Sequence, residues 1–186
     1  MRPLKMPREE LLHRCAITFK RYGYHGTTMD LLSGACGLTK ASFYHHYSNK
    51  DALLIDILSW THEQLRTHLL SIAHDATLSP RARLQAMGRC ASKLFQDDVI
   101  GCLMAVVAVD VSYTNEPLMQ PIRAFLDDWA AAFAQLFKPV HDEASATHLG
   151  RQLVADFEGA ILLARIYDDA RYIHNVIERT ATQLPD

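Results

Sequence analysis

The stretch LTKASFYHHYSNKDALL (residues 38–54) concentrates polar and aromatic side chains in two helical turns. Residues 39–47 alone hold a lysine, a serine, two histidines and three aromatic rings, and a second lysine follows at position 50. Three explanations compete for this composition: a metal site, an enzyme pocket, or a surface that contacts DNA. The spacing of the residues separates them.

The pattern does not favour a metal site or an enzyme. His45 and His46 are adjacent, so on a helix their side chains point about 100° apart. A helical metal pair needs spacing i, i+4, and none of the ten histidines has another histidine four positions later. The chain also lacks the GxSxG and HExxH motifs and a glycine-rich phosphate loop. We therefore expect no metal, no cofactor and no enzymatic activity.

The pattern around this stretch predicts a helix-turn-helix. Glycine and proline are scarce, with 8 and 7 residues, and apolar residues recur at intervals of three and four, which predicts an all-α fold. Thr28 and Thr39 are expected caps of two short helices, and Gly37 is expected to adopt a positive φ in the turn between them. About nine helices are expected, at 8–22, 29–36, 40–47, 50–74, 80–96, 101–114, 118–137, 143–167 and 169–183.

The second helix of a helix-turn-helix enters the major groove of DNA. In the helix expected at 40–47, Phe43 and Tyr47 share the inward face. The residues left facing the groove are Lys40, Ala41, Ser42, Tyr44 and His45. Lys40 can donate to guanine acceptors, and the Ala41 methyl can contact a thymine methyl. The residues expected to hold phosphate are Thr28, His46 and Lys50, and Thr39 is also expected to contact DNA.

These residues resemble the N-terminal domain of the TetR family of bacterial transcriptional regulators. The similarity covers residues 8–58 without a gap, and its core is GTTMDLLSGACGLTKASFYHHYSNKDALL. Departures from the usual family pattern are Cys36 for alanine, Ala41 for glycine and Tyr47 for phenylalanine. The resemblance implies a helix-turn-helix domain over 1–52, with the motif itself at about 28–47, and a helical ligand-binding and dimerisation domain over 53–186.

The charge distribution agrees with a DNA-binding N-terminal segment. The whole chain carries a net charge of −2, yet residues 1–50 carry +5 and the remainder −7. A polyanion would be attracted to the first part and repelled by the rest. No apolar run is long enough to span a membrane and no secretory signal is visible, so we expect a cytoplasmic protein. The four cysteines have no CxxC spacing and are expected to be free thiols.

A homodimer is expected because one helix-turn-helix reads only a few base pairs. The last two helices are the expected interface, through Leu153, Phe157, Ala160, Ile161, Ala164, Ile173, Val176, Ile177 and Thr180. The family resemblance further implies a repressor that a small ligand releases from its operator. The expected pocket walls, which favour an apolar or aromatic ligand, are Trp60, Phe95, Cys102, Met104, Val107, Tyr113, Phe125, Trp129, Phe133 and Phe157. Asp110 and Glu158 lie within apolar stretches and could meet a cation.

Alternatives remain open at this point. Cys102 opens an expected helix, where the helix N-terminus lowers the pKa of a thiol, so the chain could instead sense oxidants or electrophiles through Cys102. A TetR-like fold with a catalytic pocket would reveal itself by ligand turnover. An adaptor that binds only proteins would fail to bind DNA at low salt.

Overall fold

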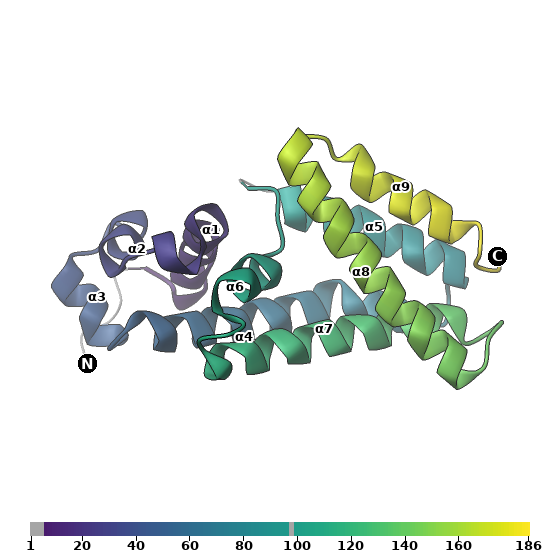
Figure 1. The fold of residues 1–186 in the computed structure, drawn as a ribbon, viewed down its shortest axis with the longest axis horizontal. Helices are drawn as coiled ribbons and strands as arrows, with labels where there is room; N and C mark the ends of the chain where they lie inside the picture. The colour runs from purple at the N-terminus through teal and green to yellow at the C-terminus, as the bar shows by residue number, and fades with distance from the viewer. Residues whose placement is uncertain (1–5, 97–98) are drawn as a thin grey trace. The chain divides into compact units, whose positions relative to one another are not determined.

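The computed structural model describes residues 6–96 and 99–186, except for the side chains of residues 92–96. Over this part of the chain the fold is all-helical, as predicted, with nine α-helices and one short 3-10 helix (Figure 1). The helices are α1 (Arg8–Gly26), α2 (Met29–Ala35), α3 (Lys40–His46), α4 (Lys50–His68), η1 (Leu70–His74), α5 (Pro80–Gln96), α6 (Leu103–Val111), α7 (Glu116–Phe137), α8 (Glu143–Tyr167) and α9 (Arg171–Ala181).

The chain forms two compact units. The first unit contains the described residues up to His62 together with Leu103–Ile122, and the second contains Glu63–Cys102 and Arg123–Asp186. The sequence grouped α6 with the C-terminal helices, whereas the structure packs α6 against α1. The boundary expected near residue 52 remains a prediction about the division of function.

Local signals explain where the helices of the first unit begin and end. Gly23, with φ of 69°, interrupts α1 before its last turn. The side-chain oxygens of Thr28 and Thr39 accept hydrogen bonds from the amides of Leu31 and Ser42, which confirms both caps. Asn49 caps α4 in the same way by accepting from the amide of Ala52 at 2.8 Å. Helix α4 is shorter than predicted, because residues 70–74 form the 3-10 helix η1.

The core of the first unit is apolar and fully shielded from water. Helix α1 packs against α2 and α6, and α2 packs against α3. The buried side chains of this core include Leu12, Phe19, Leu32, Phe43, Leu54 and Ile57. This packing holds the two short helices rigidly on α1, so their outer surfaces are presented in a fixed geometry.

The second unit consists mainly of α5, α8, α9 and most of α7. Helix α9 packs against both α5 and α8. At Gly150 on α8 the backbones meet, because an added Cβ would collide with the carbonyl oxygen of Ala130 on α7 and lie 2.8 Å from the amide nitrogen of Ala134. Within the described residues, no helix is both long and apolar enough to cross a membrane.

Candidate nucleic-acid interface

The turn between α2 and α3 sets the orientation of α3. The amide of Gly37 donates to the carbonyl of Gly34, and the amide of Leu38 donates to that of Ser33, each at 3.0 Å. Gly37 has φ of 62°, the positive value expected from the sequence. This pair of hydrogen bonds closes the C-terminal end of α2 and leads the chain directly into α3.

Helix α3 has one buried face and one open face. Phe43 is completely buried and fixes the rotation of the helix. Tyr47, just beyond the helix, donates its hydroxyl hydrogen to Asp56 at 2.6 Å, and burial raises the pKa of this tyrosine. The exposed side chains on the other face are Lys40, Ala41, Ser42, Tyr44 and His45. These are the five residues predicted to face the groove.

Lys40 is exposed but has an intramolecular partner. Its ammonium lies 2.7 Å from the carboxylate of Asp30 on α2. The hydrogen bond with Asp30 raises the pKa of Lys40, so the lysine stays charged. Thr28 and Thr39 are exposed as well, and their hydroxyl hydrogens remain able to donate while the oxygens cap the helices. His46 is half-buried beside His45.

Lys50 does not point toward solvent as the phosphate role requires. Its ammonium donates to the carbonyl oxygens of Tyr24 at 2.7 Å and Thr27 at 3.1 Å. It also lies 3.9 Å from the centre of the Tyr24 ring, a cation–π contact. Burial lowers the pKa of Lys50. In this conformation the side chain joins the start of α4 to the end of α1, and the predicted phosphate contact would require it to leave these carbonyls.

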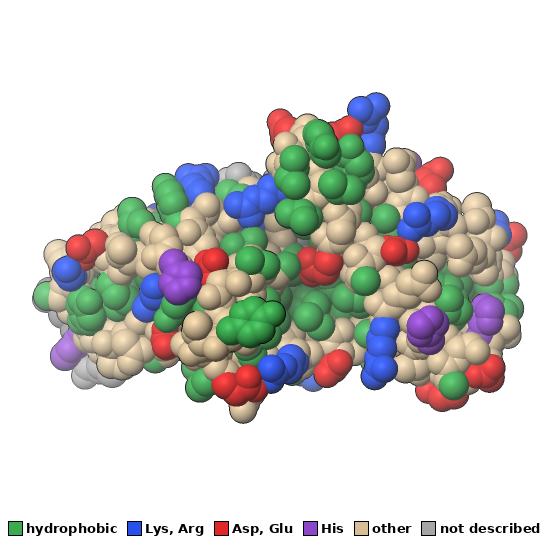
Figure 2. Space-filling model, in the orientation of Figure 1, with side chains coloured by type: hydrophobic (Ala, Val, Ile, Leu, Met, Phe, Trp, Pro, Cys, Tyr) green, Lys and Arg blue, Asp and Glu red, His purple; other side chains and the backbone are tan. Residues whose placement is uncertain are grey.

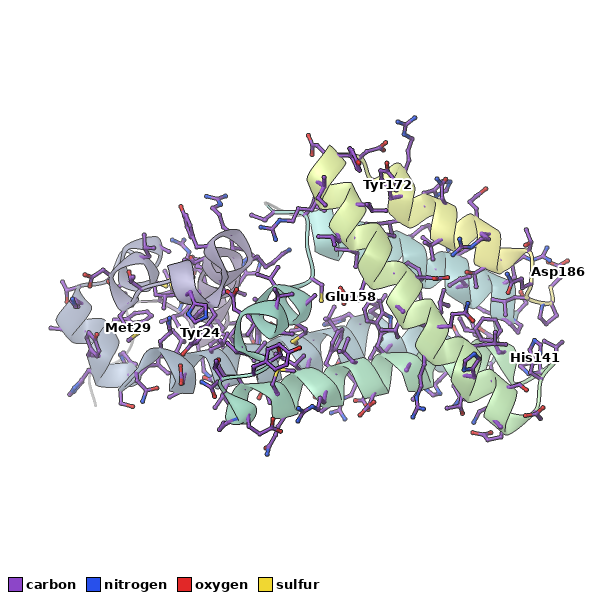
Figure 3. The ribbon with its side chains drawn as sticks, in the orientation of Figure 1. Tyr24, Met29, His141, Glu158, Tyr172 and Asp186 are labelled. Atoms are coloured by element: carbon purple, nitrogen blue, oxygen red, sulfur yellow. The ribbon has the colours of Figure 1, made fainter. Side chains whose placement is uncertain are left out.

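Sequence reasoning missed the groups that hold the end of α1 in place. Asp110 on α6 accepts from the amides of Tyr24 at 2.7 Å and His25 at 3.4 Å. The Tyr24 hydroxyl, near the end of α1 in Figure 3, donates to Asp51 at 2.6 Å, and Asn115 donates to the same carboxylate. Asp110 therefore has internal partners and is not available to a cationic ligand. The signal available in the sequence was an isolated carboxylate in an apolar helix.

The residues predicted to line a ligand pocket are divided between the two units. Phe125, Trp129, Phe133 and Phe157 form one aromatic cluster in the second unit, with ring centres 5.3–6.0 Å apart. Cys102 is buried in the same unit. Trp60, Met104, Val107 and Tyr113 belong to the first unit. Tyr113 is fully exposed, so it lines no enclosed pocket in this conformation, and the Phe95 side chain lies outside the described residues.

The nine residues predicted for the dimer interface are all buried within one chain, each at most 8% exposed. Leu153, Phe157, Ala160, Ile161 and Ala164 occupy the inner face of α8, and the remaining four lie on the inner face of α9. In this conformation they pack against the chain's own helices, and their role in a dimer stays a prediction. Near the C-terminal end of α8, Leu162, Leu163, Ile166 and Tyr167 are exposed instead. Figure 2 shows hydrophobic side chains gathered at this end of the helix.

Together, the capped two-helix motif and the exposed face of α3 define a helix-turn-helix DNA-binding protein. Residues 11–57 match the family model described as bacterial regulatory proteins, tetR family, and residues 80–179 match that of the LmrA/YxaF-like transcriptional regulator C-terminal domain. The chain belongs to the TetR family of transcriptional regulators. This membership confirms the expectation of a DNA-binding regulator rather than an enzyme.

Individual relatives align over most of the chain. The HTH-type transcriptional regulator LmrA of Bacillus subtilis is 26% identical over 84% of this chain and 85% of its own length. The HTH-type transcriptional repressor DhaR of Mycobacterium sp. is 26% identical over 86% of this chain and 82% of its own. A TetR transcriptional regulator from Legionella pneumophila has the same fold, with a TM-score of 0.88 at 20% identity and full coverage of both chains.

Proposed function

We propose that this regulator is a dimeric repressor that binds operator DNA through α3 and leaves it when a small ligand enters the second unit. The observation that carries the DNA part is the geometry of α3: Phe43 anchors one face, and the opposite face is exposed and rich in hydrogen-bonding groups. Similarity to a protein named as a repressor supports repression over activation.

Within this proposal the residues of α3 have distinct roles. Lys40 reaches guanine acceptors after leaving Asp30, and Ser42 donates to or accepts from a base edge. Ala41 allows close approach and places a methyl group against thymine. Tyr44 and His45 extend the contact along the groove. The phosphate contacts come from Thr28, Thr39 and His46, because Lys50 is held internally.

The dimer is proposed to form through the outer face of α8. Leu162, Leu163, Ile166 and Tyr167 are exposed by 57, 39, 61 and 63%. They follow the spacing i, i+1, i+4, i+5, so they form one stripe, and Gly159 continues it with no atom within 4 Å of an added Cβ. Such a stripe on a helix is apolar surface that a second copy of the chain would cover. Two copies would then supply the two reading helices that an operator needs.

The ligand is proposed to bind beside the aromatic cluster of the second unit. A gap of about 10 Å³ already lies among Leu69, Met87, Gly88, Ala91, Trp129, Phe133 and Phe157. That volume is too small for more than a single water, so a ligand must spread the surrounding helices. Coupling to DNA requires that it binds the spread form more tightly than the closed form.

Glu158 on α8 (Figure 3) indicates the chemistry of such a ligand. Its Oε1 is shielded from solvent and has no hydrogen-bond partner among the described residues. Burial raises the pKa of Glu158, and a hydrogen bond with the Cys102 thiol opposes this shift. An unsatisfied buried oxygen is costly. We infer an apolar or aromatic ligand that carries an amine or hydroxyl donor for this oxygen.

The surroundings of Cys102 do not favour the thiol-sensing alternative. Cys102 is buried beside Glu158, a carboxyl that does not favour a thiolate. The Cys90 thiol donates to the carbonyl of His68 at 3.5 Å. The ligand-released repressor is therefore the preferred proposal.

Fluorescence anisotropy with the DNA flanking the gene, against a scrambled duplex at several salt concentrations, tests the proposal. We expect preferential binding, two chains or a multiple per site, and an affinity that falls steeply with salt. Ser42→Ala should reduce the preference while leaving binding to the scrambled duplex unchanged. Equal binding to both duplexes under all conditions, by wild type and variant, would contradict the assignment of α3 as the reading helix.

A ligand screen tests the second part. Aromatic amines and alcohols, each paired with the corresponding hydrocarbon, are added to the protein–DNA complex. We expect release by the donor-bearing member of a pair, and a weaker response in Glu158→Gln. Equal release by both members would contradict the role of Glu158.

A further inference from the structure

Two cysteines that are far apart in the sequence meet inside the DNA-binding unit. Cys15 lies on α1 and Cys36 is the residue at which α2 ends. Their sulfur atoms are 3.6 Å apart, and the side chains are 0% and 3% exposed. The pair is in van der Waals contact without a bond between the sulfurs. Each cysteine occupies a position where a plain apolar residue would fill the same space.

The surroundings of the pair favour reaction at Cys36. The Cys15 thiol shares a hydrogen with the Cys36 sulfur, and this contact lowers the pKa of Cys36 while it raises that of Cys15. The guanidinium of Arg14 lowers the pKa of Cys36 further. Arg14 is held nearby through its hydrogen bond to the carbonyl of Ala35 at 3.3 Å. Burial and the nearby Glu10 oppose these effects, and the net direction favours the negative charge on Cys36 rather than on Cys15. The thiolate is the form that reacts with oxidants.

We propose that Cys15 and Cys36 are an oxidisable dithiol, converted to a disulfide by hydroperoxides, and that this conversion weakens DNA binding. The site lies outside the ligand pocket proposed above and does not depend on it. The surrounding compartment is expected to be reducing, where a disulfide of this kind is transient and reversible.

The chemistry balances with one hydroperoxide for each pair. The Cys36 thiolate donates an electron pair to the terminal oxygen of the hydroperoxide, the O–O bond breaks, and the alkoxide takes up the proton that Cys36 released. Cys36 is now a sulfenic acid. The Cys15 sulfur attacks the Cys36 sulfur, the S–S bond forms, the S–O bond breaks, and hydroxide leaves as water with the Cys15 proton. Two thiols are oxidised, and one hydroperoxide is reduced to an alcohol and water.

The position of Cys36 connects this reaction to DNA binding. A disulfide has sulfurs about 2.05 Å apart, so the two sulfurs must approach by about 1.5 Å. Cys36 immediately precedes the Gly37–Leu38 turn, and α3 begins only four residues after it. Motion at Cys36 therefore changes the orientation of α3 on α1. Because base contacts depend on sub-ångström placement of the reading helix, affinity should fall.

Cys90 provides the matched control. Its thiol donates to the carbonyl of His68 at 3.5 Å and takes no part in the proposed reaction. A Cys90→Ala variant keeps the pair, and Cys36→Ala removes it. Cys36→Ala loses little buried volume, and circular dichroism checks its fold.

The experiment treats full-length wild type and both variants with hydrogen peroxide. The protein is then denatured, free thiols are alkylated, and the intact mass is measured. In wild type and in Cys90→Ala we expect loss of two hydrogens, a Cys15–Cys36 cross-linked peptide after proteolysis, and at least tenfold weaker DNA binding that dithiothreitol restores. Cys36→Ala should keep its affinity after peroxide.

Two results would overturn the proposal. Full alkylation of Cys15 and Cys36 in peroxide-treated wild type would show that the pair does not oxidise, and this measurement needs no variant. A cross-linked protein with unchanged affinity would refute the regulatory role. Binding to DNA before oxidation is measured in the same samples, so failure of the operator assignment is recognised separately.

Discussion

The ammonium of Lys40 at the start of α3 lies 2.7 Å from the carboxylate of Asp30 on α2. The two side chains are 58% and 65% exposed, so water screens the pair and it adds little to stability. Its effect is on DNA binding. Asp30 places a negative charge beside the residue that is proposed to reach the DNA first, and Lys40 must leave this partner before it can bind.

Asp30→Asn should therefore strengthen DNA binding. The substitution removes a repulsive charge and frees Lys40, and we expect about a threefold to tenfold gain on both operator and scrambled duplexes. Anisotropy titration measures this. Glu63→Gln is the matched control, because Glu63 is also an exposed carboxylate paired with a basic residue but lies on α4. An equal gain in both variants would show that the stronger binding comes from the change in net charge and not from the release of Lys40.

Lys50→Met should lower the stability of the protein. The ammonium donates to two carbonyls that have no other cationic partner among the described contacts, so we expect a loss of about 1–3 kcal/mol in the free energy of unfolding. Lys138→Met, which removes an exposed ion pair with Glu143, should cost less than about 0.5 kcal/mol. Urea denaturation compares them. Unchanged stability combined with a salt slope lower by about one unit would restore the phosphate role.

Lys50 shows why part of the site could not be predicted from sequence. A lysine at the start of a helix is typical of an exposed side chain, and its two acceptors lie more than twenty residues earlier in the chain. The caps at Thr28 and Thr39 and the positive φ of Gly37 were predictable, since each depends on residues within four positions. Sequence patterns encode local contacts well and long-range partners poorly.

The dimer residues illustrate a different limit. Leu153, Ile161 and Ala164 recur at helical spacing, and the same spacing describes a face buried against the chain's own helices and a face buried against a second chain. Periodicity therefore identified a buried stripe correctly, but it does not distinguish between these two partners. The exposed stripe that includes Ile166 is interrupted by polar neighbours and has a weaker pattern.

Ile166→Asp should separate the proposed dimer into monomers without unfolding them. Ile166 is 61% exposed in one chain, so the new carboxylate costs little in the monomer but would be buried without a partner in the dimer. Sedimentation velocity measures the mass. Val109→Asp serves as control, because Val109 is 82% exposed on α6. A dimer that survives Ile166→Asp would exclude this face of α8.

Glu158→Gln should stabilise the protein at neutral pH and not at acid pH. Burial raises the folded-state pKa of Glu158 above its ordinary value of 4.5, so the folded protein holds this proton more tightly than the unfolded chain. The stability that protonated Glu158 contributes is therefore present below its unfolded-state pKa and is lost as the pH rises through its folded-state pKa. Glutamine does not titrate and avoids this loss. Thermal unfolding of wild type and variant is measured at neutral and at acid pH, and Glu158→Gln should be more stable than wild type only at neutral pH. A stability difference that does not change with pH would contradict this prediction.

Gly150→Ala should destabilise the second unit. The added Cβ would meet the backbone of α7 at Ala130 and Ala134, which cannot move aside as a side chain can, and we expect a loss of about 1–3 kcal/mol. Gly34→Ala is the opposite case, since its Cβ meets no atom within 4 Å and alanine favours a helix by up to about 1 kcal/mol. In urea denaturation, the midpoint should fall for Gly150→Ala and rise for Gly34→Ala. A shift of both midpoints in the same direction would contradict the close contact at Gly150.

The contact at Gly150 differs from the contact at Gly88, another buried glycine of the second unit, in how easily it can change. At Gly150 the backbones of α7 and α8 are in direct contact, so the two helices cannot move closer together there. At Gly88 on α5, the corresponding neighbour is only the flexible tip of Ile177. Met87, Gly88 and Ala91 of α5 border the small gap beside Trp129. The proposed ligand would therefore be accommodated at the lowest cost in free energy by a movement of α5, while α7 and α8 stay in contact at Gly150.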